Sequence, residues 1–132
     1  MNRLLIADAQ MDWCEFSREV LSTQGYDVSI AEDVKTLREF LKANRYDLVL
    51  VNIDLIKQGF GKPFHELLMV RIEEPIFVLI MPSYGATTIQ QTRVAFKCGA
   101  MDCVDRPLSP QRLLSLVQQL LEECRERLPN KD

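Results

Sequence analysis

Residues 47–56 read D-L-V-L-V-N-I-D-L-I. The run from Leu48 to Val51 is apolar at every position, which is typical of a parallel strand buried on both faces. The run ends on the amide of Asn52, and the carboxylate of Asp54 follows two residues later. Because such a strand needs a covering layer on each side, this stretch predicts a layered α/β fold.

Strands and helices alternate on both sides of this stretch. Further strand-like runs occupy 4–7, 27–31, 75–81 and 101–105. Apolar residues at three- and four-residue steps predict helices over 11–25, 34–41, 64–73, 87–98 and 109–124. Asp33 and Ser109 are expected to cap the second and last of these, with Pro110 at a first helical position. Right-handed crossovers then predict a doubly wound five-stranded parallel sheet with helices on both faces.

Length and composition fit one globular domain. The chain has 132 residues, 47% of them hydrophobic and 27% charged, and a net charge of −3. That charge does not indicate a nucleic-acid or anionic-membrane partner, because either would need a basic surface. No stretch reaches the ~18 apolar residues of a membrane span. We expect a cytoplasmic protein, with a domain over 1–124 and a polar tail or linker start over 125–132.

The cysteines do not predict a metal site. Cys14, Cys98, Cys103 and Cys124 form no CxxC pair, and His65 is the single histidine. Structural zinc sites need closely spaced Cys and His ligands. We therefore expect reduced, mostly buried thiols, with no bound metal and no cofactor.

Ligands of doubly wound sheets bind outside the carboxyl ends of the strands. In this chain those ends carry Asp8, Asn52 with Asp54, the segment 81–83 and the segment 105–107. Clustered carboxylates at such an edge suit Mg²⁺ binding or phosphoryl acceptance.

Four stretches, in this order and spacing, resemble the receiver domain of bacterial two-component response regulators. They are L-L-I-A-D-A (4–9), G-Y-D-V-S-I-A-E-D (25–33), Y-D-L-V-L-V-N-I-D (46–54) and G-A-M-D-C-V-D-R-P (99–107). The likeness covers residues 3–124. It implies the flavodoxin-like receiver fold, in which an aspartate ending the third strand accepts a phosphoryl group beside Mg²⁺.

The positions that the resemblance assigns to the site depart from the family pattern. The acceptor falls on Asn52, and of the two adjacent metal-binding acids Asp8 is kept while its neighbour is Ala9. The lysine before proline becomes Arg106, followed by Pro107. The hydroxyl position falls on Ile80 or Met81, or on Ser83 if the turn is shifted. The switch-aromatic position falls on Cys103.

These departures predict an inactive phosphorylation site in an intact fold. A buried Asp8 without metal or phosphate needs another partner, which we expect to be Asn52 or Arg106. We expect no enzyme and no catalytic residue, but a signalling module that acts without phosphorylation. It would dock a partner protein or dimerise through the last two helices and the fifth strand. Candidate interface residues are Arg93, Lys97, Asp102, Arg112 and Gln119.

Two alternatives stay open from the sequence. In the first, Asp54 is an unusual acceptor in a receiver that is phosphorylated. In the second, the fold binds a flavin or nucleotide, although G-F-G at 59–61 lacks the remaining residues of the known phosphate-binding loops.

Overall fold

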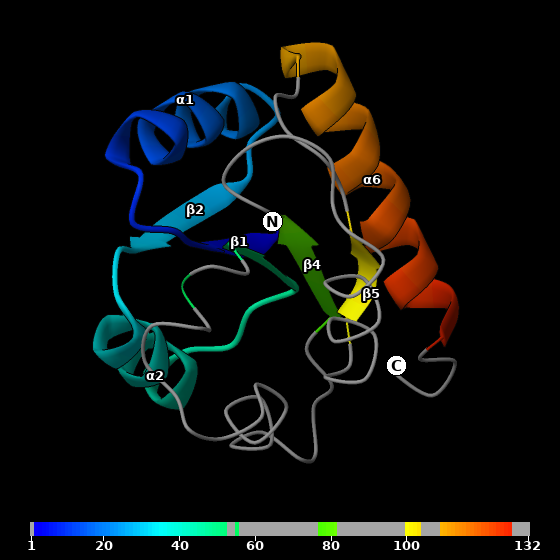
Figure 1. Cartoon of the computed structure of the whole chain (residues 1–132). Helices are drawn as coiled ribbons and strands as arrows, with labels where there is room; N and C mark the ends of the chain where they lie inside the picture. The colour runs from blue at the N-terminus through cyan, green and yellow to red at the C-terminus, as the bar shows by residue number, and fades with distance from the viewer. Residues whose placement is uncertain (1, 53–54, 56–76, 82–99, 104–108, 128–132) are drawn as a thin grey trace.

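The computed structural model describes residues 2–52, 55, 77–81, 100–103 and 109–127 (Figure 1). Its elements, in chain order, are β1 (Arg3–Ala7), α1 (Met11–Ser22), β2 (Asp27–Ala31), α2 (Val34–Ala43), β3 (Leu48–Asn52), β4 (Phe77–Met81), β5 (Ala100–Cys103) and α6 (Pro110–Arg127). The predicted helices over 64–73 and 87–98 lie outside the described residues.

The strands form one parallel sheet in the order β2-β1-β3-β4-β5. β1 pairs with β2 on one side and with β3 on the other, so the strand order reverses between β1 and β3. In the register of that central pair, Ala7 lies opposite Val51. The predicted α/β class with a parallel sheet is confirmed.

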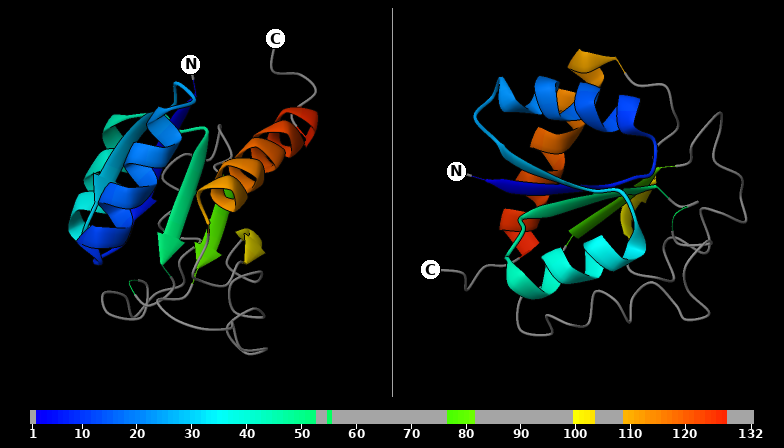
Figure 2. Two further views of the ribbon diagram at one scale, coloured as in Figure 1. Left: turned by 90° about the horizontal axis from the view of Figure 1, so that it is seen from above. Right: turned by 90° about the vertical axis from the view of Figure 1, so that its left-hand side faces the viewer.

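Helices cover both faces of the sheet. The right-hand view of Figure 2 shows α1 and α2 on opposite faces of the sheet, and α6 shares one core cluster with α1. All five residues of β3 are buried, as expected for a strand covered on both sides. The core between the sheet, α1 and α6 is apolar and contains these fully buried side chains: Leu4, Ile6, Cys14, Leu21, Leu48, Leu113 and Val117.

Both predicted N-terminal caps are confirmed. The Asp33 carboxylate accepts a hydrogen bond from the Thr36 backbone N–H at 2.7 Å. The Ser109 hydroxyl accepts one from the Arg112 backbone N–H at 3.1 Å. Each cap satisfies a backbone donor that has no partner within its helix.

Two helix ends differ from the sequence prediction. α1 ends at Ser22 rather than near Gly25. Here the chain turns, and the Thr23 hydroxyl donates a hydrogen bond to the Val20 carbonyl at 2.6 Å. Gly25 then adopts a φ of 82°, which favours glycine. At the other end, α6 continues to Arg127, since arginine and glutamate are good helix formers. The segment predicted as a polar tail therefore begins as helix.

No helix among residues 2–52, 55 and 109–127 combines the length and apolar character that a membrane crossing requires.

Candidate functional site

Asp8 and Asn52 meet at the carboxyl ends of β1 and β3. Each follows the paired residues Ala7 and Val51. Both side chains are buried, with 1% of Asp8 and 3% of Asn52 exposed. Asn52 Nδ2 donates a hydrogen bond to Asp8 Oδ1 at 3.3 Å. The predicted pairing of Asp8 with Asn52 is confirmed, while Arg106, the other proposed partner, lies outside the described residues.

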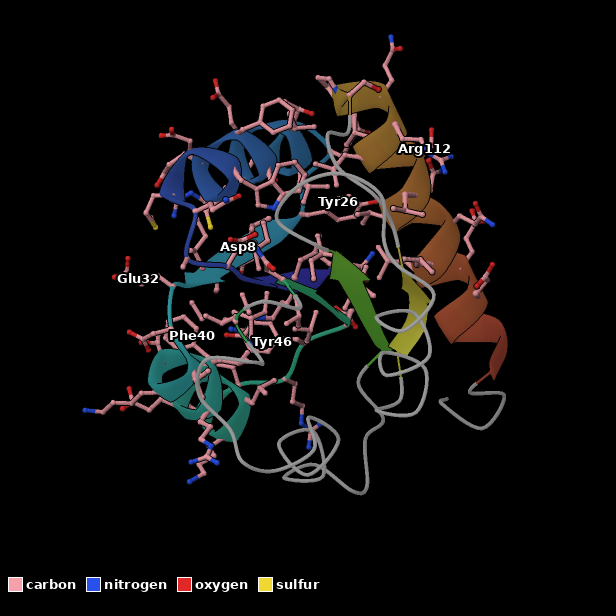
Figure 3. All side chains as sticks on the ribbon, in the orientation of Figure 1. Asp8, Tyr26, Glu32, Phe40, Tyr46 and Arg112 are labelled. Carbon is pink, nitrogen blue, oxygen red and sulfur yellow. The ribbon has the colours of Figure 1, made fainter. Side chains whose placement is uncertain are left out.

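The short loop after β1 holds Asp8 in place. Its Oδ1 atom also accepts from the Gln10 backbone N–H at 2.8 Å, an Asx-type turn that leads into α1. The Asp8 N–H donates to the Ala31 carbonyl at 3.0 Å, and the Cys14 thiol donates to the Asp8 carbonyl at 3.4 Å. Contacts with β2 and α1 therefore fix the residue, and Figure 3 shows Asp8 between these elements.

The chemistry of this pair differs from that of two carboxylates. The Asn52 amide is neutral and presents its N–H groups to the Asp8 carboxylate. A carboxylate accepts hydrogen bonds, so the two side chains attract each other without a cation between them. An amide nitrogen is a poor nucleophile, and an acyl phosphate requires a carboxylate oxygen. The pair stabilises a buried acid but offers no acceptor atom at Asn52.

Several other predicted site positions can be placed. Ala9 is exposed and contributes no side-chain oxygen. In the β3–β4 register Met81 lies level with Asn52, and Ile80 lies level with Val51. Cys103 of β5 lies opposite Ile80. The remaining predicted positions, which lie outside the described residues, are Asp54, Ser83, Arg106 and Pro107.

The structure describes three of the five candidate interface residues. Arg112 and Gln119 are exposed on α6, and Gln119 donates to Glu123 at 3.3 Å. Asp102 belongs to β5, whereas Arg93 and Lys97 lie outside the described residues. Apolar residues of α6 pack into the core. Over 111–123, the part of this helix whose side chains are described beyond Pro110, the exposed residues are polar: Gln111, Arg112, Ser115, Gln118, Gln119 and Glu122.

Sequence reasoning missed two residues that hold Asp8, namely Gln10 and Cys14. An aspartate in the loop before a helix is a common signal of such an Asx turn. Ser17 is fully buried on the core side of α1, and its hydroxyl makes no hydrogen bond. Trp13 is half-buried against the core, with its ring centroid 5.8 Å from that of Phe16.

The prediction of reduced, buried thiols is confirmed for Cys14, which is a buried, reduced cysteine. Within the ranges that the structure describes, no group of three or more His, Cys, Asp or Glu side chains is arranged to hold a metal ion.

A comparison of the sequence with known families agrees with the fold. The profile of the response regulator receiver domain matches residues 4–118. The chain belongs to the response regulator receiver domain family.

Known receivers share both sequence and fold with this chain. It is 30% identical over 125 residues to the nitrogen assimilation regulatory protein NtrX of Azorhizobium caulinodans, covering 94% of this chain and 27% of NtrX. It is 25% identical over 118 residues to the transcriptional regulatory protein ZraR of Escherichia coli K12, covering 89% of this chain and 26% of ZraR. This receiver domain therefore spans about a quarter of the length of these relatives.

The fold of the receiver is also found in solved structures. A CheY-like receiver domain protein from Methanospirillum hungatei superposes with a TM-score of 0.80 at 19% sequence identity, covering 96% of this chain and 98% of that one. At this identity the similarity shows the fold alone.

Proposed function

We propose that this receiver domain signals without phosphorylation of an aspartate. The observation that carries the proposal is the buried Asn52 at the carboxyl end of β3, with its amide nitrogen 3.3 Å from Asp8. The resemblance of the sequence to receivers implies that Asn52 stands where the family has its acceptor aspartate, which supports the proposal. A neutral amide neither attacks phosphorus as a carboxylate does nor forms an acyl phosphate.

The residues at this edge do not fit the Mg²⁺ ion that the family pattern implies. Mg²⁺ requires near-octahedral oxygen ligands, usually including one or two carboxylates. Among the described residues, Asp8 Oδ1 already accepts two N–H groups, from Gln10 and Asn52, and Ala9 supplies no side-chain oxygen. We propose that Mg²⁺ binds weakly, and we assign it no step.

The proposed activity is protein recognition rather than catalysis. Support comes from the exposed polar side of α6, which carries Arg112 and Gln119, and from relatives that are named as regulatory proteins. In this proposal the domain is the interaction module of a two-component-type regulator. A partner protein would bind at α6 and β5.

The decisive experiment is incubation of the whole chain with acetyl phosphate and Mg²⁺, followed by intact mass measurement under conditions that preserve acyl phosphates. We expect an unchanged mass. Trp13, the single tryptophan, precedes Cys14, whose thiol contacts Asp8, so its fluorescence should report a change at this site. We expect no such change in wild type. A phosphoryl adduct on the wild-type chain would overturn the proposal.

A matched variant gives that experiment its control. Ala9→Asp/Asn52→Asp restores both missing carboxylates at this edge of the sheet. We expect it to bind Mg²⁺ more tightly than wild type, measured by calorimetric titration. An Asp54→Asn variant covers the alternative acceptor, because an adduct that it abolishes in the wild-type background would place phosphorylation at Asp54.

A further inference from the structure

The outward sides of α1 and α2 carry opposite charge at the same spacing. The acidic stripe consists of three exposed residues of α1: Asp12, Glu15 and Glu19. The basic stripe consists of three exposed residues of α2: Lys35, Arg38 and Lys42. Both sets follow one three-residue step and one four-residue step, so each lies along one side of its helix.

The two stripes cannot meet within one molecule. α1 and α2 cover opposite faces of the sheet, as the right-hand view of Figure 2 shows. Each helix turns its buried side inward, through Cys14 and Leu21 on α1 and through Leu37 and Leu41 on α2. The charged sides therefore point outward in opposite directions. A single copy presents an acidic surface on one side and a basic surface on the other.

One charge of the acidic stripe is already paired on its own helix. Glu15 forms a close ion pair with Arg18 on its own helix at 2.7 Å, which leaves Asp12 and Glu19 as the dominant charges of the acidic stripe. The basic stripe is extended by exposed Arg45 just past the end of α2. Glu39 is the one acidic residue in the segment 34–45.

The basic stripe suits a compact acidic surface better than an extended polyanion. The chain as a whole carries a net charge of −3, which repels nucleic acid and anionic lipid at long range. A second copy of the chain supplies an acidic helix side whose spacing matches that of the basic stripe. Opposite charge at matched spacing both attracts the copies and sets their relative position.

We propose that copies of this chain associate head to tail, with the acidic stripe of one copy against the basic stripe of the next. The proposal does not depend on Asn52 or on phosphorylation. Two associated copies still present one unpaired stripe at each end of the pair. Longer assemblies should therefore form as the protein concentration rises, unless the rotation between copies closes a ring. Neither stripe contains an apolar residue, so the contact is electrostatic and salt-dependent.

Sedimentation velocity of the whole chain over a concentration series tests the proposal. At about 30 mM salt we expect the weight-average sedimentation coefficient to rise with concentration. At about 300 mM salt the exposed charges are more strongly screened, because the Debye length is shorter. We expect the dissociation constant to rise at least ~10-fold, so that the protein sediments as a monomer. If the chain stays monomeric at low salt, the proposal is wrong. The basic stripe would then be open to a different acidic partner.

Charge-swap variants identify the contact. Arg38→Glu/Lys42→Glu reverses the basic stripe, and Asp12→Lys/Glu19→Lys reverses the acidic stripe. We expect each variant alone to be monomeric at low salt, because each then carries two stripes of one sign. An equimolar mixture should associate again, which a merely misfolded variant would not do. Association that survives either reversal, or a mixture that stays monomeric, contradicts the proposal.

Arg112→Glu is the control for a different interface. Arg112 is exposed on α6, outside both stripes. We expect this variant to associate like wild type at low salt. If it abolishes association while the stripe variants leave it intact, then the copies meet through α6 and the head-to-tail arrangement is wrong.

Discussion

Asn52 of β3 donates its side-chain N–H to the carboxylate of Asp8 at 3.3 Å, in a site where both residues are almost fully buried. The residues are 44 positions apart in the chain, and parallel pairing of β1 with β3 brings them together. A buried carboxylate is costly unless hydrogen bonds compensate it. Here the amide and the Gln10 N–H supply that compensation.

Asn52→Asp should destabilise the fold when no divalent cation is present. The substitution replaces a donor with a second carboxylate next to Asp8, and two buried like charges at hydrogen-bond distance repel each other. We expect the free energy of unfolding to fall by about 1–3 kcal/mol at neutral pH, which urea denaturation would measure.

Mg²⁺ provides the matched comparison for this variant. Added Mg²⁺ should restore part of the lost stability of Asn52→Asp and leave wild type unchanged, because only the variant offers paired carboxylates. Equal stability of the variant and wild type in the presence of a chelator would show that the Asp8–Asn52 hydrogen bond is not important to the fold.

Ser17→Ala should stabilise the protein. The Ser17 hydroxyl is buried and makes no hydrogen bond, whereas alanine fills the same position without a polar atom. We expect a gain of about 1 kcal/mol in the free energy of unfolding. Ser115→Ala on the exposed side of α6 is the control for helix propensity, since it changes the same residue type without burial. If both variants gain equally, then the buried hydroxyl carries no penalty.

Arg3 connects three segments at the opposite edge of the sheet. Its guanidinium donates to Asn44 at 3.2 Å, lies 3.6 Å from the Asp27 carboxylate and sits 5.5 Å from the centroid of the Tyr46 ring. Arg3→Met keeps the aliphatic stem but removes these contacts, so thermal or chemical unfolding should show a loss of about 1 kcal/mol.

Two further variants separate the contributions at Arg3. Asp27→Asn should cost little, because the Arg3–Asp27 pair is exposed to solvent. Arg3→Lys should keep the charge but lose the guanidinium contact with the Tyr46 ring and the directed bond to Asn44. If Arg3→Lys is as stable as wild type, then charge alone accounts for the contribution of Arg3.

Asp33 makes the stability of α2 depend on pH. The Thr36 backbone N–H, then the Thr36 side chain and the Lys35 charge, lower the pKa of Asp33 below its ordinary 3.8. A lowered folded-state pKa means that the cap contributes stability above the ordinary value and loses it as pH falls through the folded-state pKa. Asn is an equally good cap that does not titrate, so Asp33→Asn should remove this component of acid destabilisation.

The measurement is a set of thermal melts of wild type and Asp33→Asn from neutral pH to below pH 3.8. The melting temperature of wild type should fall relative to that of the variant only in the acidic part of this range. Parallel curves for the two proteins would exclude a titrating cap.

Much of the fold could be predicted because the signals are local. The apolar run 48–51 predicted a buried strand, and Asp33 and Ser109 predicted helix starts that the structure contains. The Asp8–Asn52 pairing was also within reach, because parallel strands bring their carboxyl ends to one edge. The ends of α1 and α6 were placed less well, since helix termini depend on small differences between competing hydrogen bonds.

The sequence by itself determined the elements, the layered α/β class and the amide at the end of β3, because apolar periodicity, capping residues and residue identity are properties of the chain. The tertiary structure decided which groups satisfy Asp8, that Met81 lies level with Asn52, and that the acidic and basic stripes face opposite ways. These facts depend on strand order, register and the sheet face that each helix covers. They are set by packing between segments far apart in the chain, which no local pattern encodes.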